Sequence, residues 1–164
     1  MDQELPLDSN TFRRLMARFA TGVAVLAVTS PDEGVVSGMT ANAIASVSLD
    51  PYLLLVCVDR NANIVQAVLN ADSFSLSLLR DEQLSLSDYF AGRWQGEPPE
   101  FEFYAGELAP VLKGAIGVIQ CRRSNVLEGG DHWIVLGEVA AINLETPPPS
   151  PLIFFGSQYH NLTG

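Results

Sequence analysis

The sequence lacks the motifs of several common cofactor and metal sites. It contains neither G-x-G-x-x-G nor G-x-x-x-x-G-K-[ST], which excludes the two commonest nucleotide-binding loops. It has no H-E-x-x-H motif, no cluster of cysteine and histidine, and two histidines in all. We therefore expect no metal site. The G-x-S-x-G motif of many hydrolases is also missing.

Positive charge is scarce. Nine Lys and Arg stand against 19 Asp and Glu, a net charge of −10, which argues against nucleic acid and against an anionic membrane surface as partners. No apolar run reaches the length of a membrane helix. The first residues are acidic and lack the basic-then-apolar pattern of a signal peptide. These features predict a cytoplasmic protein, and they leave room for a phosphorylated cofactor held by local amides and one arginine.

Cysteine is nearly absent as well. Cys57 and Cys121 lie far apart, each inside an apolar run and outside any C-x-x-C pair. We expect two buried free thiols rather than a disulfide. The length of 164 residues and the 48% hydrophobic content predict a single domain, residues 1–164, with a substantial core.

What the sequence does contain is an unusual stretch of small residues at 36–51. Its polar members are hydroxyls and one amide, interleaved with glycine and alanine. Small residues let a ligand lie close to the backbone, and neutral polar groups bind it without fixed charge. From residue types alone, two interpretations stay open: a ligand-binding wall, or a buried strand of any β-domain.

The rest of the chain predicts a mainly β fold. We expect an amphipathic helix at 9–20 capped by Ser9 or Asn10, and a hairpin over 22–48 in which the small-residue stretch is the second strand. In the strand at 73–79, Ser73, Ser75 and Ser77 should form the wetter face. Further strands are expected at 52–58, 115–126, 132–143 and 152–155, short helices after Asn61 and Asp81, and an irregular loop at 91–103. An antiparallel barrel, closed or nearly closed, with short appended helices fits this pattern.

His132 opens a predicted strand directly after a Gly-Gly turn. It is either an exposed turn histidine or a site residue at a strand mouth. A Ser-His-Asp triad with the adjacent Asp131 is disfavoured, because neighbouring strand residues point to opposite faces.

Taken together, several segments resemble the flavin reductase-like family, the FMN-binding split barrels. The similarity rests on segments that follow one another in the family's order. They are 19–23 (FATGV), 37–43 (SGMTANA), 46–51 (SVSLDP), 74–79 (FSLSLL), 88–92 (DYFAG), 130–139 (GDHWIVLGEV) and 151–159 (PLIFFGSQY). Two departures from the family pattern are Tyr52, where a second proline is frequent, and the 61–63 loop, which carries amides where Ser or Thr is usual.

The resemblance implies which residues bind the cofactor. The flavin ring would lie against one strand, the following loop would meet the ring edge and the phosphate arm, and a second loop with a basic residue would help hold the phosphate. The implied residues are Thr40, Ala41, Asn42, Ser46, Val47, Ser48, Asn61, Asn63, Arg93 and Tyr159. His132 would lie on the nicotinamide side.

The resemblance also implies an enzyme, an NAD(P)H:flavin oxidoreductase. It would transfer hydride from NADH or NADPH to FMN or FAD and supply reduced flavin to a partner monooxygenase, with homodimers as the assembly. The scarcity of basic residues favours NADH. Two alternatives stay open: a split barrel with tightly bound flavin that acts on another substrate, and a small barrel that binds an apolar ligand without redox chemistry.

Overall fold

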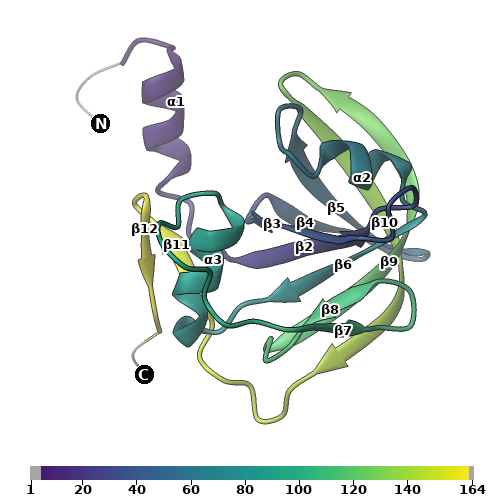
Figure 1. The fold of residues 1–164 in the computed structure, drawn as a ribbon. Helices are drawn as coiled ribbons and strands as arrows, with labels where there is room; N and C mark the ends of the chain where they lie inside the picture. Colours follow the sequence, from purple (N-terminus) through teal and green to yellow (C-terminus); the bar gives the residue numbers. More distant parts are fainter. Residues whose placement is uncertain (1–4, 163–164) are drawn as a thin grey trace.

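The computed structural model describes residues 5–162 and is built on one seven-stranded antiparallel sheet (Figure 1). In spatial order its strands are β3 (Val36–Ala41), β2 (Ala24–Thr29), β6 (Ser73–Leu78), β9 (Gly117–Gly129), β10 (His132–Leu144), β5 (Tyr52–Asp59) and β4 (Ile44–Leu49). Every neighbouring pair is antiparallel. The prediction of a mainly β, antiparallel fold is confirmed.

The two edge strands of this sheet, β3 and β4, are joined by only two residues, Asn42 and Ala43. Three Cα–Cα steps span at most about 11 Å, so the sheet must curl until its two edges meet at this corner. The Ala43 carbonyl accepts a hydrogen bond of 3.0 Å from the Cys57 amide on β5. The two edges do not pair with one another along their length, which makes the barrel a split one.

The small-residue stretch was predicted to be one strand of a hairpin. That prediction is wrong, because the stretch forms two strands, β3 and β4. β3 does pair with β2, with Thr40 opposite Val25. β4 instead pairs with β5 on the far edge, with Ser46 opposite Leu54. The alternation of small polar residues continues through Asn42 and hides the break between the two strands.

The helices are short. They are α1 (Ser9–Met16), α2 (Val65–Asn70) and α3 (Leu84–Phe90), with a 3-10 turn, η1 (Asp81–Gln83), before α3. The cap of α1 is Asp8 rather than Ser9 or Asn10, because its carboxylate accepts the Thr11 amide at 2.8 Å. Asn61 does not cap α2, which begins at Val65. No residue of α1 is buried, and the helix stands away from the sheet in Figure 1.

A small hairpin covers one face of β6. It consists of β7 (Phe103–Ala105) and β8 (Pro110–Leu112). Ser75 and Ser77, predicted to be on the wetter face, are fully buried beneath it. The Ser75 hydroxyl donates to the Pro110 carbonyl, and Ser77 Oγ accepts the Leu112 amide at 3.2 Å. The two hydroxyls bind backbone groups of β8 that would otherwise bind water, so the serines can be buried without losing hydrogen bonds. The alternation of apolar and polar residues alone therefore does not predict their burial.

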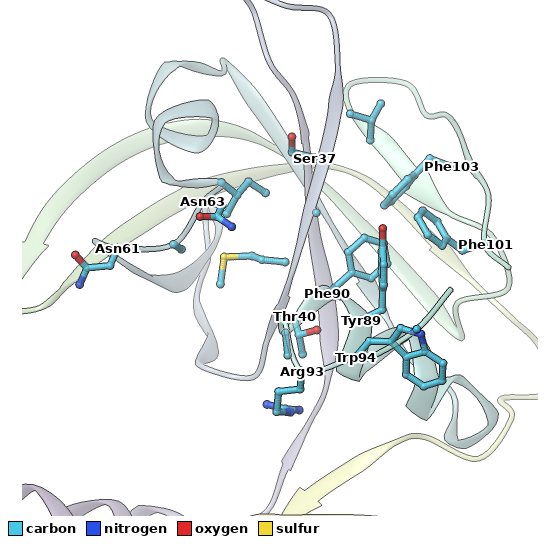
Figure 2. Close-up of a pocket in the computed structure, with 18 residues that line it drawn as sticks. Ser37, Thr40, Asn61, Asn63, Tyr89, Phe90, Arg93, Trp94, Phe101 and Phe103 are labelled. Atoms are coloured by element: carbon cyan, nitrogen blue, oxygen red, sulfur yellow. The ribbon is translucent and has the colours of Figure 1, made fainter. Parts of the chain in front are cut away.

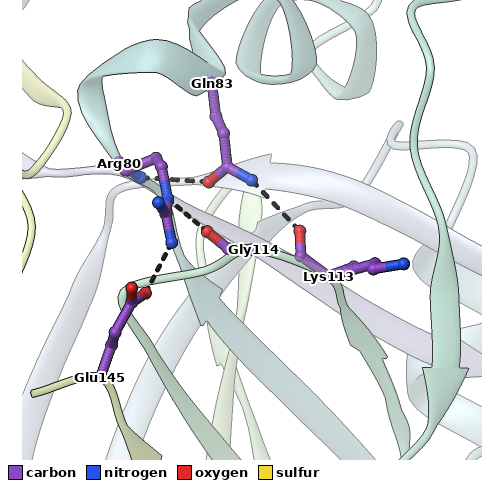
Figure 3. Close-up of polar contacts among 5 residues, drawn as sticks. All are labelled: Arg80, Gln83, Lys113, Gly114 and Glu145. Carbon is purple, nitrogen blue, oxygen red and sulfur yellow. Dashed lines mark hydrogen bonds and ion pairs between the residues drawn. The ribbon is translucent and has the colours of Figure 1, made fainter.

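Arg80 ties three segments together beside this hairpin (Figure 3). Its Nε donates to the Gly114 carbonyl at 2.6 Å and its Nη2 lies 2.6 Å from Glu145 Oε2. Gln83 accepts the Arg80 amide at 3.1 Å and donates to the Lys113 carbonyl at 3.3 Å. The start of η1 is thus held to the β8–β9 turn and to the end of β10.

A third, three-stranded sheet lies below α1 and joins both ends of the chain. It contains β1 (Thr21–Gly22), β11 (Ile153–Phe155) and β12 (Gln158–His160). Within residues 5–162, none of the helices has the length and apolar character needed to cross a membrane.

Both cysteines are free thiols, as predicted, but the predicted burial is confirmed only for Cys121 and is wrong for Cys57. Cys121 is fully buried, and burial raises its pKa to about 12. Burial also raises the pKa of Cys57, which is only partly covered.

The core leaves no room for a side chain at Gly137 on β10. A Cβ there would lie 2.5 Å from Cζ of Phe74 and 2.7 Å from Cβ of Cys121. We expect Gly137→Ala to lower the free energy of unfolding by about 1–3 kcal/mol through overpacking, measured by urea denaturation. Gly22→Ala is the control, because a Cβ at Gly22 meets nothing within 4 Å. Equal stability of the two variants would contradict the packing of β10 on Phe74.

Candidate functional site

A cavity of about 940 Å³ lies between β3, the loop after β5, and the end of α3 with the loop that follows it (Figure 2). Its residues come from chain segments 36–40, 61–64, 89–96 and 101–103. Among its lining residues, all of them in the part of the chain that the structure describes, Arg93 is the one that carries a charge.

The floor of the cavity is β3. It offers Ser37, Gly38, Met39 and Thr40, of which Gly38 is required by close packing. A Cβ on Gly38 would lie 3.0 Å from the Phe90 ring of α3. Glycine at this position thus lets α3 approach β3, and it adds no side chain to the cavity floor.

One wall is aromatic. The rings of Tyr89, Phe90, Phe101 and Phe103 pack edge to face or tilted, with centroids 5.0–5.8 Å apart. Trp94 lies beside them in Figure 2, and its indole N–H donates to the Glu97 carbonyl at 2.7 Å. The predicted irregular loop is confirmed up to Glu102. Phe101 and Phe103 find partners in this cluster, and such a wall suits a flat aromatic ligand.

The opposite wall is a pair of amides, Asn61 and Asn63, on the other side of the cavity from the aromatic rings (Figure 2). The turn that presents them is closed by Asp59, whose carboxylate accepts the Asn61 backbone amide at 2.7 Å. Both side chains are exposed. An amide can donate and accept, so this wall provides neutral hydrogen bonds of either sense.

A chain of polar contacts runs from the floor to the C-terminal sheet. Thr40 Oγ1 donates to the Ser87 carbonyl at 2.6 Å, and Ser87 Oγ lies 2.7 Å from Tyr159 Oη. Arg93 donates from Nη2 to Tyr159 Oη and from Nε to Asp88 Oδ1, the latter at 3.0 Å. The chain links β3, α3, the following loop and β12, so these elements position one another.

Of the ten residues implied to bind the cofactor, four line the cavity: Thr40, Asn61, Asn63 and Arg93. Tyr159 lies behind Arg93 and holds it. The other five do not line it. They are Ala41, which is buried in the core, and Asn42, Ser46, Val47 and Ser48, which are at or beyond the corner between β3 and β4.

Asn42 and the β4 residues form a second exposed surface. Asn42 Nδ2 donates to Thr21 Oγ1 at 3.2 Å, and Ser48 Oγ accepts the Asp50 amide at 3.1 Å. Val47 is 46% exposed. These residues stay separate from the cavity because the chain turns from one sheet edge to the other between β3 and β4.

His132 does not line the cavity either. It begins β10, opposite Asp59 at the foot of the 61–64 loop, and its ring is partly exposed. The expectation that Asp131 does not orient it is wrong: Asp131 Oδ1 lies 2.8 Å from His132 Nδ1. Asp131 belongs to the turn after Gly130, where strand alternation does not apply. The hydrogen bond from His132 lowers the pKa of the Asp131 carboxyl.

Sequence reasoning missed Ser87 and Asp88 on α3. Ser87 is fully buried, yet nothing in its local sequence distinguishes it from Ser85, two residues earlier on the same helix. Asp88 could have been found, because it precedes Arg93 by five residues across a helix end, a spacing that lets a carboxylate reach back to a guanidinium. Among residues 5–162, no three His, Cys, Asp or Glu side chains gather to hold a metal ion.

Comparison with known proteins adds to this geometry. Residues 16–163 match the family described as flavin reductase like domain. The chain is 40% identical over 151 residues to the reductase component of 4-hydroxyphenylacetate 3-monooxygenase from Thermus thermophilus, covering 92% of this chain and 95% of that one. It is 33% identical over 160 residues to the NADH-dependent flavin reductase StyB from Pseudomonas fluorescens, covering 97% and 93%.

The fold agrees with these relatives. Flavin reductase PheA2 superposes with a TM-score of 0.90 at 36% identity, covering 96% of this chain and all of that one. The seven-stranded split barrel with its few short helices is therefore shared along with the sequence. The chain belongs to the family of flavin reductase-like domains.

Proposed function

We propose that this protein, acting as one domain, is an NAD(P)H:flavin oxidoreductase that supplies reduced flavin to a partner monooxygenase. The observation that carries the proposal is the cavity, lined by an aromatic wall, neutral amides and hydroxyls, and one arginine, in a chain of this family. Its volume of about 940 Å³ is in the range of cofactor sites. Relatives named as NADH-dependent flavin reductase and as a monooxygenase reductase component support the same reaction and partner.

The residues present fit a flavin. A low glycine floor at Gly38 and the rings of Phe90 and Phe101 suit a planar tricyclic ring, and the neutral groups suit its many hydrogen-bonding atoms. A flavin held here would supply the acceptor for the hydride of a reduced nicotinamide. The protein's own part is to bind and orient the two partners and to exclude water.

Each proposed binding residue has a place in this scheme. Thr40 contacts the ring, and Asn61 and Asn63 bind polar atoms from the opposite wall. Arg93, held by Asp88 and Tyr159, binds the phosphate. Four corner residues bind flavin from the second surface, where Ser46 and Val47 are exposed and Ser48 is half-buried. They are Asn42, Ser46, Val47 and Ser48. Ala41, whose side chain is buried in the core, contacts flavin only through its backbone.

NADH fits the charges better than NADPH. Arg93 is the cavity's one charged residue and already pairs with Asp88 at 2.9 Å. The loop that continues from Trp94 carries Glu97, Glu100 and Glu102. A 2′-phosphate near this loop would meet like charge without a free cation.

Free flavin should behave as a substrate. We expect NADH oxidation, followed at 340 nm in air-saturated buffer so that oxygen reoxidises the flavin, to require added FMN or FAD and to saturate with its concentration. The control is the same assay without added flavin. Oxidation that is independent of added flavin would instead indicate a tightly bound prosthetic group, and no oxidation with any flavin would overturn the proposal.

His132 is the proposed nicotinamide contact. Its place opposite Asp59, two residues before Asn61 of the cavity wall, supports this proposal. We expect His132→Ala to raise KM for NADH several-fold while changing flavin affinity little. Asp131→Asn, which keeps the shape but removes the charge beside the ring, should give a smaller rise. Unchanged nicotinamide kinetics in His132→Ala would rule out this role.

We also propose a homodimer, because α1 presents an uncovered apolar stripe. Phe12 and Leu15 are 56% and 64% exposed, and Phe19 just beyond the helix is 69% exposed. A stripe of this kind marks an interaction surface. A second copy of the chain would cover this stripe. Val47 and Leu49 of β4 are also exposed, and they offer the second copy a further apolar contact at the flavin-binding corner.

The stripe can be tested by sedimentation equilibrium at micromolar concentration. We expect dimers for the native chain, and at least a tenfold weaker dimer for Phe12→Ser combined with Leu15→Ser, since about 1.4 kcal/mol suffices for that factor and two buried apolar side chains contribute more. Arg14→Ser, on the same helix and also exposed, is the matched control. A monomeric native chain would contradict the proposal.

A further inference from the structure

Thr40 can present only hydrogen-bond acceptors to the cavity. A hydroxyl has one proton to donate and two lone pairs that accept. Its oxygen lies 2.6 Å from the Ser87 carbonyl, and a carbonyl oxygen has no proton, so Thr40 must donate in this contact. The proton is therefore used inside the protein, and the hydroxyl oxygen of this lining residue has only lone pairs left for a ligand.

The Ser87 carbonyl is held where it is. Ser87 is fully buried on α3, and its carbonyl also accepts the Ala91 amide at 3.0 Å as part of the helix. The Ser87 hydroxyl is anchored as well. Arg93 only donates, so Tyr159 Oη accepts from it, and the same Oη lies 2.7 Å from Ser87 Oγ. Across the gap, Thr40 is fixed on β3 by its pairing with Val25 of β2.

This fixed sense of donation distinguishes Thr40 from the other polar groups of the cavity. Asn61 and Asn63 can turn their amides to donate or accept, and the Ser37 hydroxyl can rotate. Arg93 donates only. Among the polar side chains that line the cavity, where the Tyr89 hydroxyl is also free to rotate, Thr40 is thus the one that selects a donor on the ligand and disfavours an acceptor.

On the proposed function, the ligand is a flavin ring that must bind in its oxidised form. The edge of the oxidised isoalloxazine carries two carbonyl oxygens and the ring nitrogens N1 and N5, all of which accept. Its one N–H is at N3. An acceptor-only group that contacts the polar edge of this ring is therefore matched by N3–H and by no other ring atom.

We propose that Thr40 accepts the N3–H of the isoalloxazine ring, and that the buried Ser87 sets this role. Thr40 is then a specificity-determining residue and Ser87 a positioning residue, which acts on the ligand only through Thr40. The arrangement selects ring systems with an imide N–H and rejects those in which this proton is replaced.

The test uses lumiflavin, which has no ribityl chain, and 3-methyllumiflavin, in which a methyl group replaces the N3 proton. Dissociation constants come from fluorescence quenching with the native chain, Thr40→Val and Thr40→Ser. Valine keeps the shape and suits a strand, and serine keeps the hydroxyl. We expect Thr40→Val to weaken lumiflavin binding about tenfold, the effect of one hydrogen bond, and to leave 3-methyllumiflavin binding unchanged. Thr40→Ser should match the native chain.

Two results would overturn the inference. One is that Thr40→Val binds lumiflavin as tightly as the native chain does, or loses affinity equally for both ligands. The other is that Thr40→Val weakens FMN but not lumiflavin, which would assign the contact to a ribityl hydroxyl. The native chain gives an independent measurement, because it should bind lumiflavin at least tenfold more tightly than the 3-methyl compound. A native chain that reduces flavin with NADH yet shows no such preference refutes this inference and leaves the proposed function standing.

Discussion

The two-residue connection between β3 and β4 is the constraint on which the rest of the structure depends. It joins the two edges of a seven-stranded sheet through Asn42 and Ala43 alone. The sheet cannot stay open with this connection, so it curls around the apolar core formed by β2, β5, β6 and β9. Because of this connection, the small residues of 36–51 lie in two places. Those of β3 line the cavity floor, and those of β4 lie at the exposed corner.

The second organising element is α3, which packs against β3 and makes three contacts that shape the site. Its Phe90 meets Gly38, its Ser87 carbonyl holds the Thr40 hydroxyl, and its Asp88 holds Arg93. A seven-residue helix has little stability of its own. Its position is set by burial of Leu86 and Ser87 and by the contact to Tyr159 from the other end of the chain.

How much of this could be predicted from the sequence depends on the range of the interactions. The strands, the short helices and the irregular aromatic loop follow local patterns, and most were predicted within a few residues. The pairing of β4 with β5 and the burial of Ser75 and Ser77 were not, because both depend on segments far away in the chain. In the site, hydroxyls, amides and one arginine were identifiable by type and resemblance. Ser87 was not, because its role comes from a backbone carbonyl that any residue has.

The burial of the Cys121 thiol matters because of the chemistry of the product. Free reduced flavin reacts with oxygen and forms hydrogen peroxide, so a protein that releases it is exposed to an oxidant of its own making. Peroxide attacks the thiolate. With the pKa of Cys121 raised to about 12, only on the order of one molecule in 10⁵ carries that thiolate at neutral pH. A β9 side chain at the centre of the core is thereby protected from the oxidative damage that turnover itself would cause.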